Sequence, residues 1–184
     1  MTMPKISWGN VPDSTEGGFE KLPAGPYVVR VVSARYDQMK NYTEVVYDIA
    51  EGEHAGYYSD AWGQTHPFAH RFFMSYKDKA LSMTKGRLNA FTESNPGFDA
   101  MAASDADRFD LFTGRIVGVN IQEEEYEYNG EVKTRMTVCE VWPAQAVRDG
   151  KVKPRSKKKL DGSEETQSSA QLYQLNADDI DVPF

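Results

Sequence analysis

Polar and apolar residues alternate along the first half of the chain in the manner of β-strands. Residues 27–36, YVVRVVSARY, are rich in β-branched and aromatic residues, and residues 42–50, YTEVVYDIA, follow after a short polar turn. Residues 70–76, HRFFMSY, have the same character. In the second of these stretches one face carries Thr43, Val45, Tyr47 and Ile49. The pattern predicts three strands, the second of them half-buried.

A helical period replaces this alternation after the third strand. Between residues 78 and 94 apolar residues recur at helical spacing, and Asn95-Pro96-Gly97 ends the run. Residues 98–112 predict a shorter helical or irregular segment. Two long strand-like segments, 115–128 and 131–143, then flank Asn129-Gly130, the strongest short-range signal for a β-hairpin.

Three strands, a helix and a closing hairpin follow one another in the order of the five-stranded oligonucleotide-binding (OB) barrel. We therefore predict a mainly β domain of this type over residues 22–146, with the helix between the third and fourth strands. A chain of 184 residues, 40% of them hydrophobic, can bury one such core. Residues 1–21 predict an N-terminal arm, residues 147–175 a disordered basic and polar linker, and residues 176–184 an acidic tip.

Cysteine content and hydropathy indicate the cellular compartment in which the protein is expected. Cys139 is the only cysteine, so no intramolecular disulfide and no cysteine-based zinc site can form, which fits a reducing compartment. No stretch approaches the roughly 18 apolar residues that span a bilayer, and the N-terminus has no basic region followed by an apolar run. We expect a cytoplasmic protein that is neither secreted nor inserted into a membrane.

The charge is unevenly placed along the chain. The formal net charge is −7, yet residues 151–160 carry six basic and no acidic residues, and residues 161–184 carry six acidic and no basic residues. The body before residue 151 is itself acidic. Such a body binds phosphate only if its Arg and Lys residues gather on one face, so their positions matter more than the total.

The last nine residues, NADDIDVPF, combine carboxylates with exposed apolar residues. Most acidic tails only keep a protein soluble, but a solvating tail gains nothing from Ile, Val and Phe. A terminal Phe after Pro is a good docking group, because its ring fits an apolar pocket, its carboxylate meets a cation and Pro limits the entropy lost on binding. We interpret as partner-docking residues Asp178, Asp179, Ile180, Asp181, Val182, Pro183 and Phe184.

This ending resembles the acidic tip of bacterial single-stranded DNA-binding proteins, in which several Asp residues precede an apolar residue, Pro and a terminal Phe. Here Val182 replaces the more usual Ile, and Ile180 interrupts the acidic run. Residues 8–32 and 42–60 also resemble the small phage-encoded single-stranded DNA-binding proteins of bacteriophage replication and recombination modules. The two resemblances imply an OB-fold protein of the host-cell cytoplasm. Such a protein coats and protects single strands during replication, recombination or repair and recruits the enzymes of these processes through its tip.

A sequence-independent single-strand binder needs cations for the phosphates and exposed aromatic faces for the bases, each stack being worth about 1–3 kcal/mol. Any one aromatic residue on a β-strand more often belongs to the core, and any one surface Arg is usually only solvated. The hypothesis therefore depends on the candidate residues taken together. The candidate DNA-binding residues are Arg30, Arg35, Tyr36, Lys40, Tyr42, Tyr58, Trp62, Arg71, Phe73, Tyr76, Lys77, Lys133 and Arg135. Tyr126 and Tyr128 lie near the hairpin turn, whereas Glu123, Glu124 and Glu125 count against a phosphate surface there unless they point away.

Other classes of function are less well supported by the sequence. Asp60, His66 and His70 fall within one loop, but Pro67 prevents the helix on which the two His residues would share a face. No HExxH motif, phosphate-cradling Gly-rich loop or Cys–His pair is present, so we expect no enzyme, cofactor or metal site. Two alternatives stay open: a protein-interaction adaptor on a small β-barrel that does not bind nucleic acid, and a single-strand annealing or recombination mediator. The oligomeric state is also open, homo-oligomers included.

Overall fold

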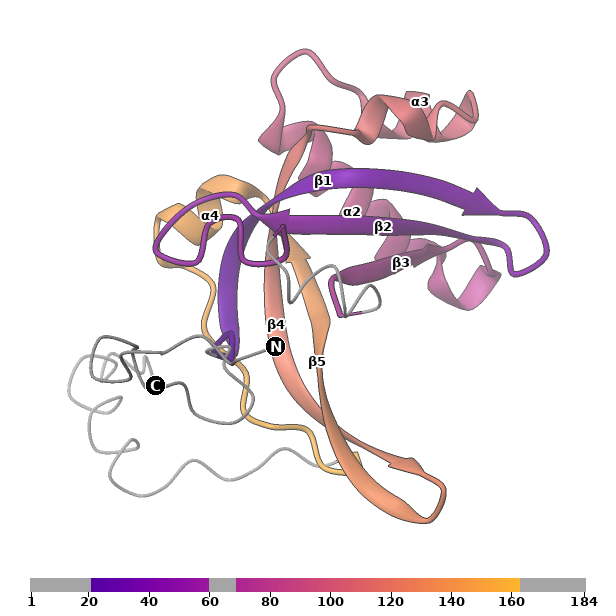
Figure 1. Cartoon of the computed structure of the whole chain (residues 1–184). Coiled ribbons are helices and arrows are strands. Elements are labelled where there is room, and N and C mark those ends of the chain that lie inside the picture. The colour runs from indigo at the N-terminus through magenta and orange to yellow at the C-terminus, as the bar shows by residue number, and fades with distance from the viewer. Residues whose placement is uncertain (1–20, 60–68, 163–184) are drawn as a thin grey trace, which may run out of the picture.

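The computed structural model describes residues 21–59 and 69–162, and within them the protein is mainly β (Figure 1). Five antiparallel strands form one sheet in the order β3-β2-β1-β4-β5. The strands are β1 (Gly25–Asp37), β2 (Tyr42–Ile49), β3 (Arg71–Ser75), β4 (Ile116–Tyr128) and β5 (Glu131–Trp142). The helical elements are η2 (Asp78–Ala80), α2 (Leu81–Ser94), α3 (Ala100–Asp105), η3 (Phe109–Phe112) and α4 (Ala144–Arg148).

The predicted order of strands and helix is confirmed. Three strands precede α2, and a hairpin follows it, with Asn129 and Gly130 both at positive φ as a tight two-residue turn requires. β3 and β5, the two ends of the sheet, approach each other, but no hydrogen-bonded ladder joins them within the described residues. The sheet is therefore curled but open.

The core lies on the inner side of the curled sheet. β2 alternates buried and half-buried residues along its whole length, as the sequence pattern predicted. Val45 and Tyr47 of β2 join Phe72 and Met74 of β3 in this core. From α2, Phe91 is fully buried against them, and the helix contacts β3, β4 and β5. The helix thus covers the region where the two ends of the sheet approach each other.

β1 changes partners along its length. Its first half, from Gly25 to Arg30, pairs with β4, and its second half, from Val29 to Asp37, pairs with β2. A bulge between Val31 and Ser33 shifts the register in between. Because a bulge moves the following side chains to the other face, Tyr36 lies opposite the buried Thr43 and faces the core.

The folded body does not end near residue 146, where the sequence placed the start of a disordered linker. α4 follows β5 directly, Val152 is only 4% exposed, and Lys158 forms a β-bridge with Glu124. The segment is polar, but side chains and main chain of β4 satisfy its hydrogen bonds, so it packs without a large apolar content. Residues 1–20, the rest of the predicted linker (163–175) and the predicted tip (176–184) lie outside the described residues.

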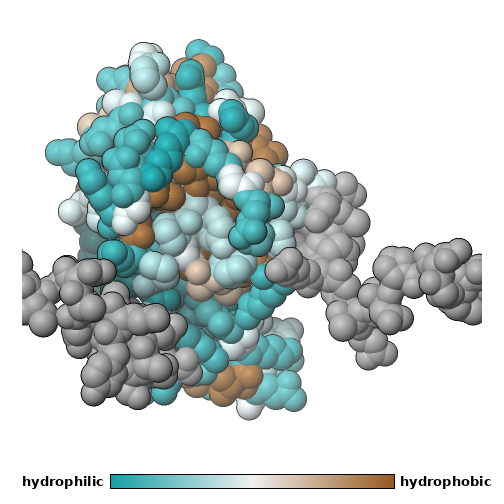
Figure 2. Space-filling view, turned by 90° about the vertical axis from the view of Figure 1, so that its left-hand side faces the viewer, coloured by the Kyte–Doolittle hydropathy of each residue, from teal (hydrophilic) through white to brown (hydrophobic). Residues whose placement is uncertain are grey.

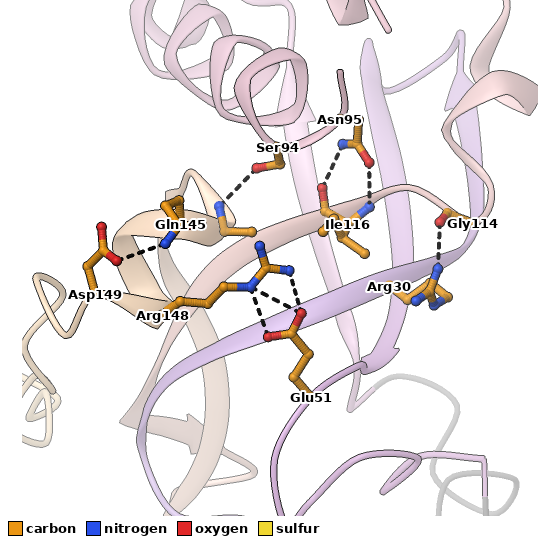
Figure 3. A network of polar contacts seen from close by, with 10 residues as sticks. Arg30, Glu51, Ser94, Asn95, Gly114, Ile116, Gln145, Arg148 and Asp149 are labelled. Carbon is orange, nitrogen blue, oxygen red and sulfur yellow. Dashed lines mark hydrogen bonds and ion pairs between the residues drawn. The ribbon is translucent and has the colours of Figure 1, made fainter. Parts of the chain in front are cut away.

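Polar contacts attach α4 to the end of α2 and to the loop after β2 (Figure 3). The Ala144 amide donates to the Ser94 hydroxyl at 2.9 Å, and the Arg148 guanidinium lies against the Glu51 carboxylate, with Nε 3.1 Å from Oε2. The Arg148 guanidinium also lowers the pKa of Glu51, chiefly through these hydrogen bonds. α4 also packs on β4 at Gly118. There is no room for a side chain at this position, since an added Cβ would lie 2.7 Å from Val147 Cγ2 of α4.

Candidate nucleic-acid interface

The outer face of β1, β2 and β3 brings together several of the predicted DNA-binding residues. In the register of the sheet, Arg35 lies opposite Glu44, which lies opposite Phe73. The rows on either side add Tyr42 and Arg71 to the same face. We call this surface, formed by Arg35, Tyr42, Glu44, Arg71 and Phe73, the three-strand face.

The aromatic pair of this face is preorganised. Phe73 is 43% exposed, and its ring meets the half-buried Tyr42 ring edge to face, with centroids 4.8 Å apart. An exposed ring held by a second ring is a suitable surface for a nucleobase, because stacking needs a flat apolar face and little loss of side-chain freedom. The sequence alternation predicted one exposed pair on the third strand, and it is Phe73 with Arg71.

Cations surround the aromatic pair. Lys40, in the β1–β2 turn, lies with its Nζ 5.7 Å from the centre of the Tyr42 ring, and interaction with the Tyr42 hydroxyl raises the pKa of Lys40. Lys77 is exposed just beyond β3, where the Tyr76 amide donates to the Asn41 carbonyl. The two lysines therefore lie at the same end of the three-strand face.

Carboxylates interrupt this cationic surface. Glu44 accepts from Arg71 with Nη1 2.6 Å from Oε1, and both side chains are about one-fifth exposed. Arg35 lies on the other side of Glu44 in the register and has no ion pair among the described residues. Asp37, opposite Tyr42 in the register, adds a second carboxylate to the same side of the sheet. The two guanidinium groups are therefore balanced, and the excess positive charge around the aromatic pair comes from Lys40 and Lys77.

Three predicted stacking residues pack against the core, one of them buried and two half-buried. Tyr58 is 5% exposed and stacks on the His70 ring at 4.7 Å, and burial raises the pKa of its hydroxyl. Tyr36 stacks on Phe109, and Tyr76 hydrogen-bonds through its hydroxyl with Thr43 and Ser104. The expectation of an exposed ring was wrong at Tyr58, which packs within the 51–59 loop. Tyr36 and Tyr76 are half-buried against the core, Tyr36 because the bulge in β1 turns it inward.

Arg30 lies apart from the other candidates. It is on the half of β1 that pairs with β4, and its guanidinium donates to the Gly114 carbonyl at 3.0 Å (Figure 3). It lines a pocket of about 440 Å³ whose walls are mainly apolar, together with Asp48, Ile49 and Val32. Figure 2 views the molecule from the side of α4 and shows a hollow with brown, hydrophobic atoms along its upper wall.

The β4–β5 hairpin forms a second surface with aromatic and cationic groups. Beyond Ile121 the hairpin extends past the end of β1 as an arm, visible at the bottom of Figure 1. The Arg135 guanidinium lies 5.1 Å from the centre of the Tyr126 ring, and the Lys133 ammonium lies 4.9 Å from that of Tyr128. These two cation–π pairs lie on one face of the arm, because Tyr126 and Tyr128 are two residues apart on a strand.

The three consecutive glutamates of the arm are each paired with a basic side chain. Glu123 accepts from Lys21 at 3.1 Å, Glu124 lies 3.0 Å from Arg135, and Glu125 lies 3.1 Å from Lys157. Lys157 and the Leu160 amide lower the pKa of Glu125, so this carboxylate stays ionised. The sequence analysis did not predict which basic residues neutralise these glutamates, although the runs EEE at 123–125 and KKK at 157–159 are complementary in charge.

Some of the predicted residues lie outside the part of the chain that the structure describes. These include Trp62 and the partner-docking residues 178–184, as well as Asp60 and His66 of the loop considered for metal binding. Residues 21–59 and 69–162 hold no group of three or more His, Cys, Asp or Glu side chains arranged for a metal ion. In the same ranges no helix has the length and apolar character needed to cross a membrane.

Comparison of the chain with models of known protein families gives no match, and comparison with curated proteins gives none either. The functional argument therefore depends on the geometry of the two surfaces.

Proposed function

We propose that the protein binds single-stranded DNA without sequence preference, through the three-strand face and the β4–β5 arm. The observation that carries the proposal is the exposed Phe73 ring held against the half-buried Tyr42 ring, with Arg35, Lys40 and Lys77 around them. Aromatic surfaces for bases and nearby cations for phosphates are the two requirements of such binding. The tyrosine–cation pairs of the arm supply both kinds of group a second time.

The strand arrangement supports an OB-type fold for this function. An OB barrel has a helix between its third and fourth strands and binds oligonucleotides on the face of strands 2 and 3. Here α2 occupies that place in the chain, and Tyr42 and Phe73 lie on the outer face of β2 and β3. The approach of β3 to β5 also supports it, since these two strands complete the barrel in OB domains.

The cellular role and the partners follow from the resemblances described above. We propose that the protein coats and protects single strands in phage replication, recombination or repair. Its terminal residues 178–184 then dock onto enzymes of these processes. On this proposal the protein is a binding module and not an enzyme, and it needs no cofactor.

Fluorescence anisotropy of a labelled oligo(dT) tests the proposal. Phe73→Ala removes one stacking surface and is expected to weaken binding by about 1–3 kcal/mol, or roughly 5- to 150-fold. Met101→Ala is the control, because Met101 is similarly exposed, at 37%, and lies on α3, whose main contacts are with α2 and η3. Equal affinities for Phe73→Ala and the wild type, or no binding by the wild type at 50 mM salt, contradict the proposal.

The two alternatives predict different results in the same experiments. An adaptor that does not bind nucleic acid gives no anisotropy change with oligo(dT) although its fold is intact. An annealing mediator accelerates pairing of complementary strands beyond the rate expected from coating alone, which a strand-annealing assay measures.

A further inference from the structure

Residues 151–160, which we call the strap, follow the outer edge of β4 along the arm. In Figure 1 the strap runs from α4 alongside the arm towards its end. β1 stops pairing with β4 at Ile121, so from Gln122 onwards this edge of β4 is free to take another partner. The strap occupies it, with a parallel bridge between Lys158 and Glu124.

Main-chain and side-chain hydrogen bonds attach the strap at several points. The Lys158 amide donates to the Glu123 carbonyl and the Glu125 amide donates to the Lys158 carbonyl, both at 2.8 Å. The side-chain amides of Asn120 and Gln122 donate to the strap carbonyls of Lys153 and Ser156, at 2.9 and 2.7 Å. Asn120 and Gln122 are buried, so removal of the strap would leave their buried amide groups without these acceptors.

The charges of the strap match the acidic residues of the arm. Lys157 Nζ lies 3.1 Å from a Glu125 oxygen, Lys158 Nζ lies 3.5 Å from a Glu124 oxygen, and Arg155 pairs with Glu140 of β5. The strap thus brings cations to a strand whose own sequence, QEEEYEY, would repel a polyanion.

We propose that the strap is a fixed, charge-compensating part of the DNA interface, in which Lys157 and Lys158 neutralise Glu124 and Glu125 so that the arm can lie against phosphates. This inference rests on the proposed function. The two lysines act as positioning residues: they work through the glutamates and do not themselves hold the DNA. The arm's contacts with DNA come from the tyrosine–cation pairs at Tyr126 and Tyr128, on a surface that is otherwise lined by carboxylates.

A charge-balanced set of variants tests the proposal in the full-length chain. Lys157→Gln with Lys158→Gln leaves Glu124 and Glu125 partly uncompensated, and oligo(dT) affinity is expected to fall about tenfold at 50 mM salt and less at 300 mM. A fourfold variant, which adds Glu124→Gln and Glu125→Gln to these two changes, restores the net charge. Its affinity is expected to return to the wild-type value or above. The matched control is Lys151→Gln with Lys153→Gln, which removes the same charge from the strap without unpairing the arm's glutamates and is expected to change affinity less than twofold.

The result of the fourfold variant decides between two roles of the lysines. If it binds as weakly as the lysine double variant, the lysines hold the DNA directly and the proposal is overturned. An unchanged affinity in the lysine double variant also overturns it.

Two measurements without DNA separate this inference from the proposed function. The amide protons of Glu125 and Lys158 are expected to be protected from hydrogen exchange, and fast exchange at both would show that the strap is not docked. The melting temperature at low salt is expected to fall in the lysine double variant and to recover in the fourfold variant. If the wild type binds no single-stranded DNA, the proposed function fails, whereas these two measurements still decide whether the strap compensates the acidic run.

Discussion

Replacement of Gly118 by Ala tests whether α4 and the chain that follows it are packed closely onto β4. Gly118 is not among the residues at positive φ, so an alanine suffers no backbone strain and its effect is steric. A Cβ there would lie 2.7 Å from Val147 Cγ2, 2.9 Å from the Trp142 carbonyl oxygen and 3.1 Å from that of Pro143. The two carbonyls belong to the main chain and can move only if the end of β5 and the start of α4 shift.

Overpacking of this kind costs about 1–3 kcal/mol, and the two main-chain contacts place Gly118→Ala in the upper part of that range. At about 2–4 °C per kcal/mol for a chain of this size, the melting temperature is expected to fall by roughly 4–12 °C. Val147→Ala in the same chain removes one of the three contacts and is expected to recover only part of the loss. Gly86→Ala is the control, because nothing lies within 4 Å of its added Cβ in α2 and the change stabilises a helix by about 0.5–1 kcal/mol.

Differential scanning calorimetry of the variants measures these shifts. A Gly118→Ala variant that melts with the wild type would refute the close packing of α4 on β4. The strap continues from α4, so such a result would also weaken the argument for its path along the arm.

Three further predictions concern stability and titration. Arg148 lowers the pKa of Glu51, so their ion pair stabilises the fold above the ordinary pKa of a glutamate and loses this contribution as the pH falls through the lowered pKa. For so exposed a pair the contribution is less than about 1 kcal/mol. The difference in melting temperature between Arg148→Ala and the wild type is expected to shrink below about pH 4. Burial raises the pKa of Tyr58, so Tyr58→Phe is expected to leave the tyrosinate absorbance change near pH 10 unaltered, and a reduced amplitude there would contradict its burial. Asn95 is buried, and its side chain bonds the Phe91 carbonyl and both the amide and the carbonyl of Ile116, so Asn95→Ala is expected to destabilise the fold by about 2–4 kcal/mol in urea unfolding. Glu93→Ala, at the exposed position two residues earlier, is expected to change the stability little.

The hydrophobic pattern predicted the order of elements because each signal was local. The alternation in β2, the helix at α2 and the Asn129-Gly130 turn depend only on residues near each other in the chain, and all three are confirmed. The side-chain orientation of Tyr36 was not predictable in this way. It depends on the bulge between Val31 and Ser33, which follows from how β1 pairs with two different strands.

The candidate site was predicted in part for the same reason. Arg71 and Phe73 share a face by simple alternation, and cross-strand register then brings Arg35 and Tyr42 to them. The path of residues 147–162 was missed because composition marked them as too polar to fold. Their docking depends on acceptors and donors offered by β4, such as the side chain of Gln122, and a single segment does not reveal such partners.

The salt dependence of binding tests whether the Arg and Lys residues that form ion pairs leave their carboxylates when DNA binds. Arg35, Lys40, Lys77 and Lys133 have no ion pair among the described residues, and contact of these four with phosphates would give a slope of log affinity against log salt of about −3. If Arg71, Arg135, Lys157 and Lys158 also left their carboxylates for phosphates, the slope would approach about −6. The strap proposal requires Lys157 and Lys158 to stay with their glutamates, whereas it allows Arg71 and Arg135 to contact phosphates. A slope between about −3 and −4 therefore supports it, and a slope near −6 shows that the lysine pairs also open on binding and contradicts it.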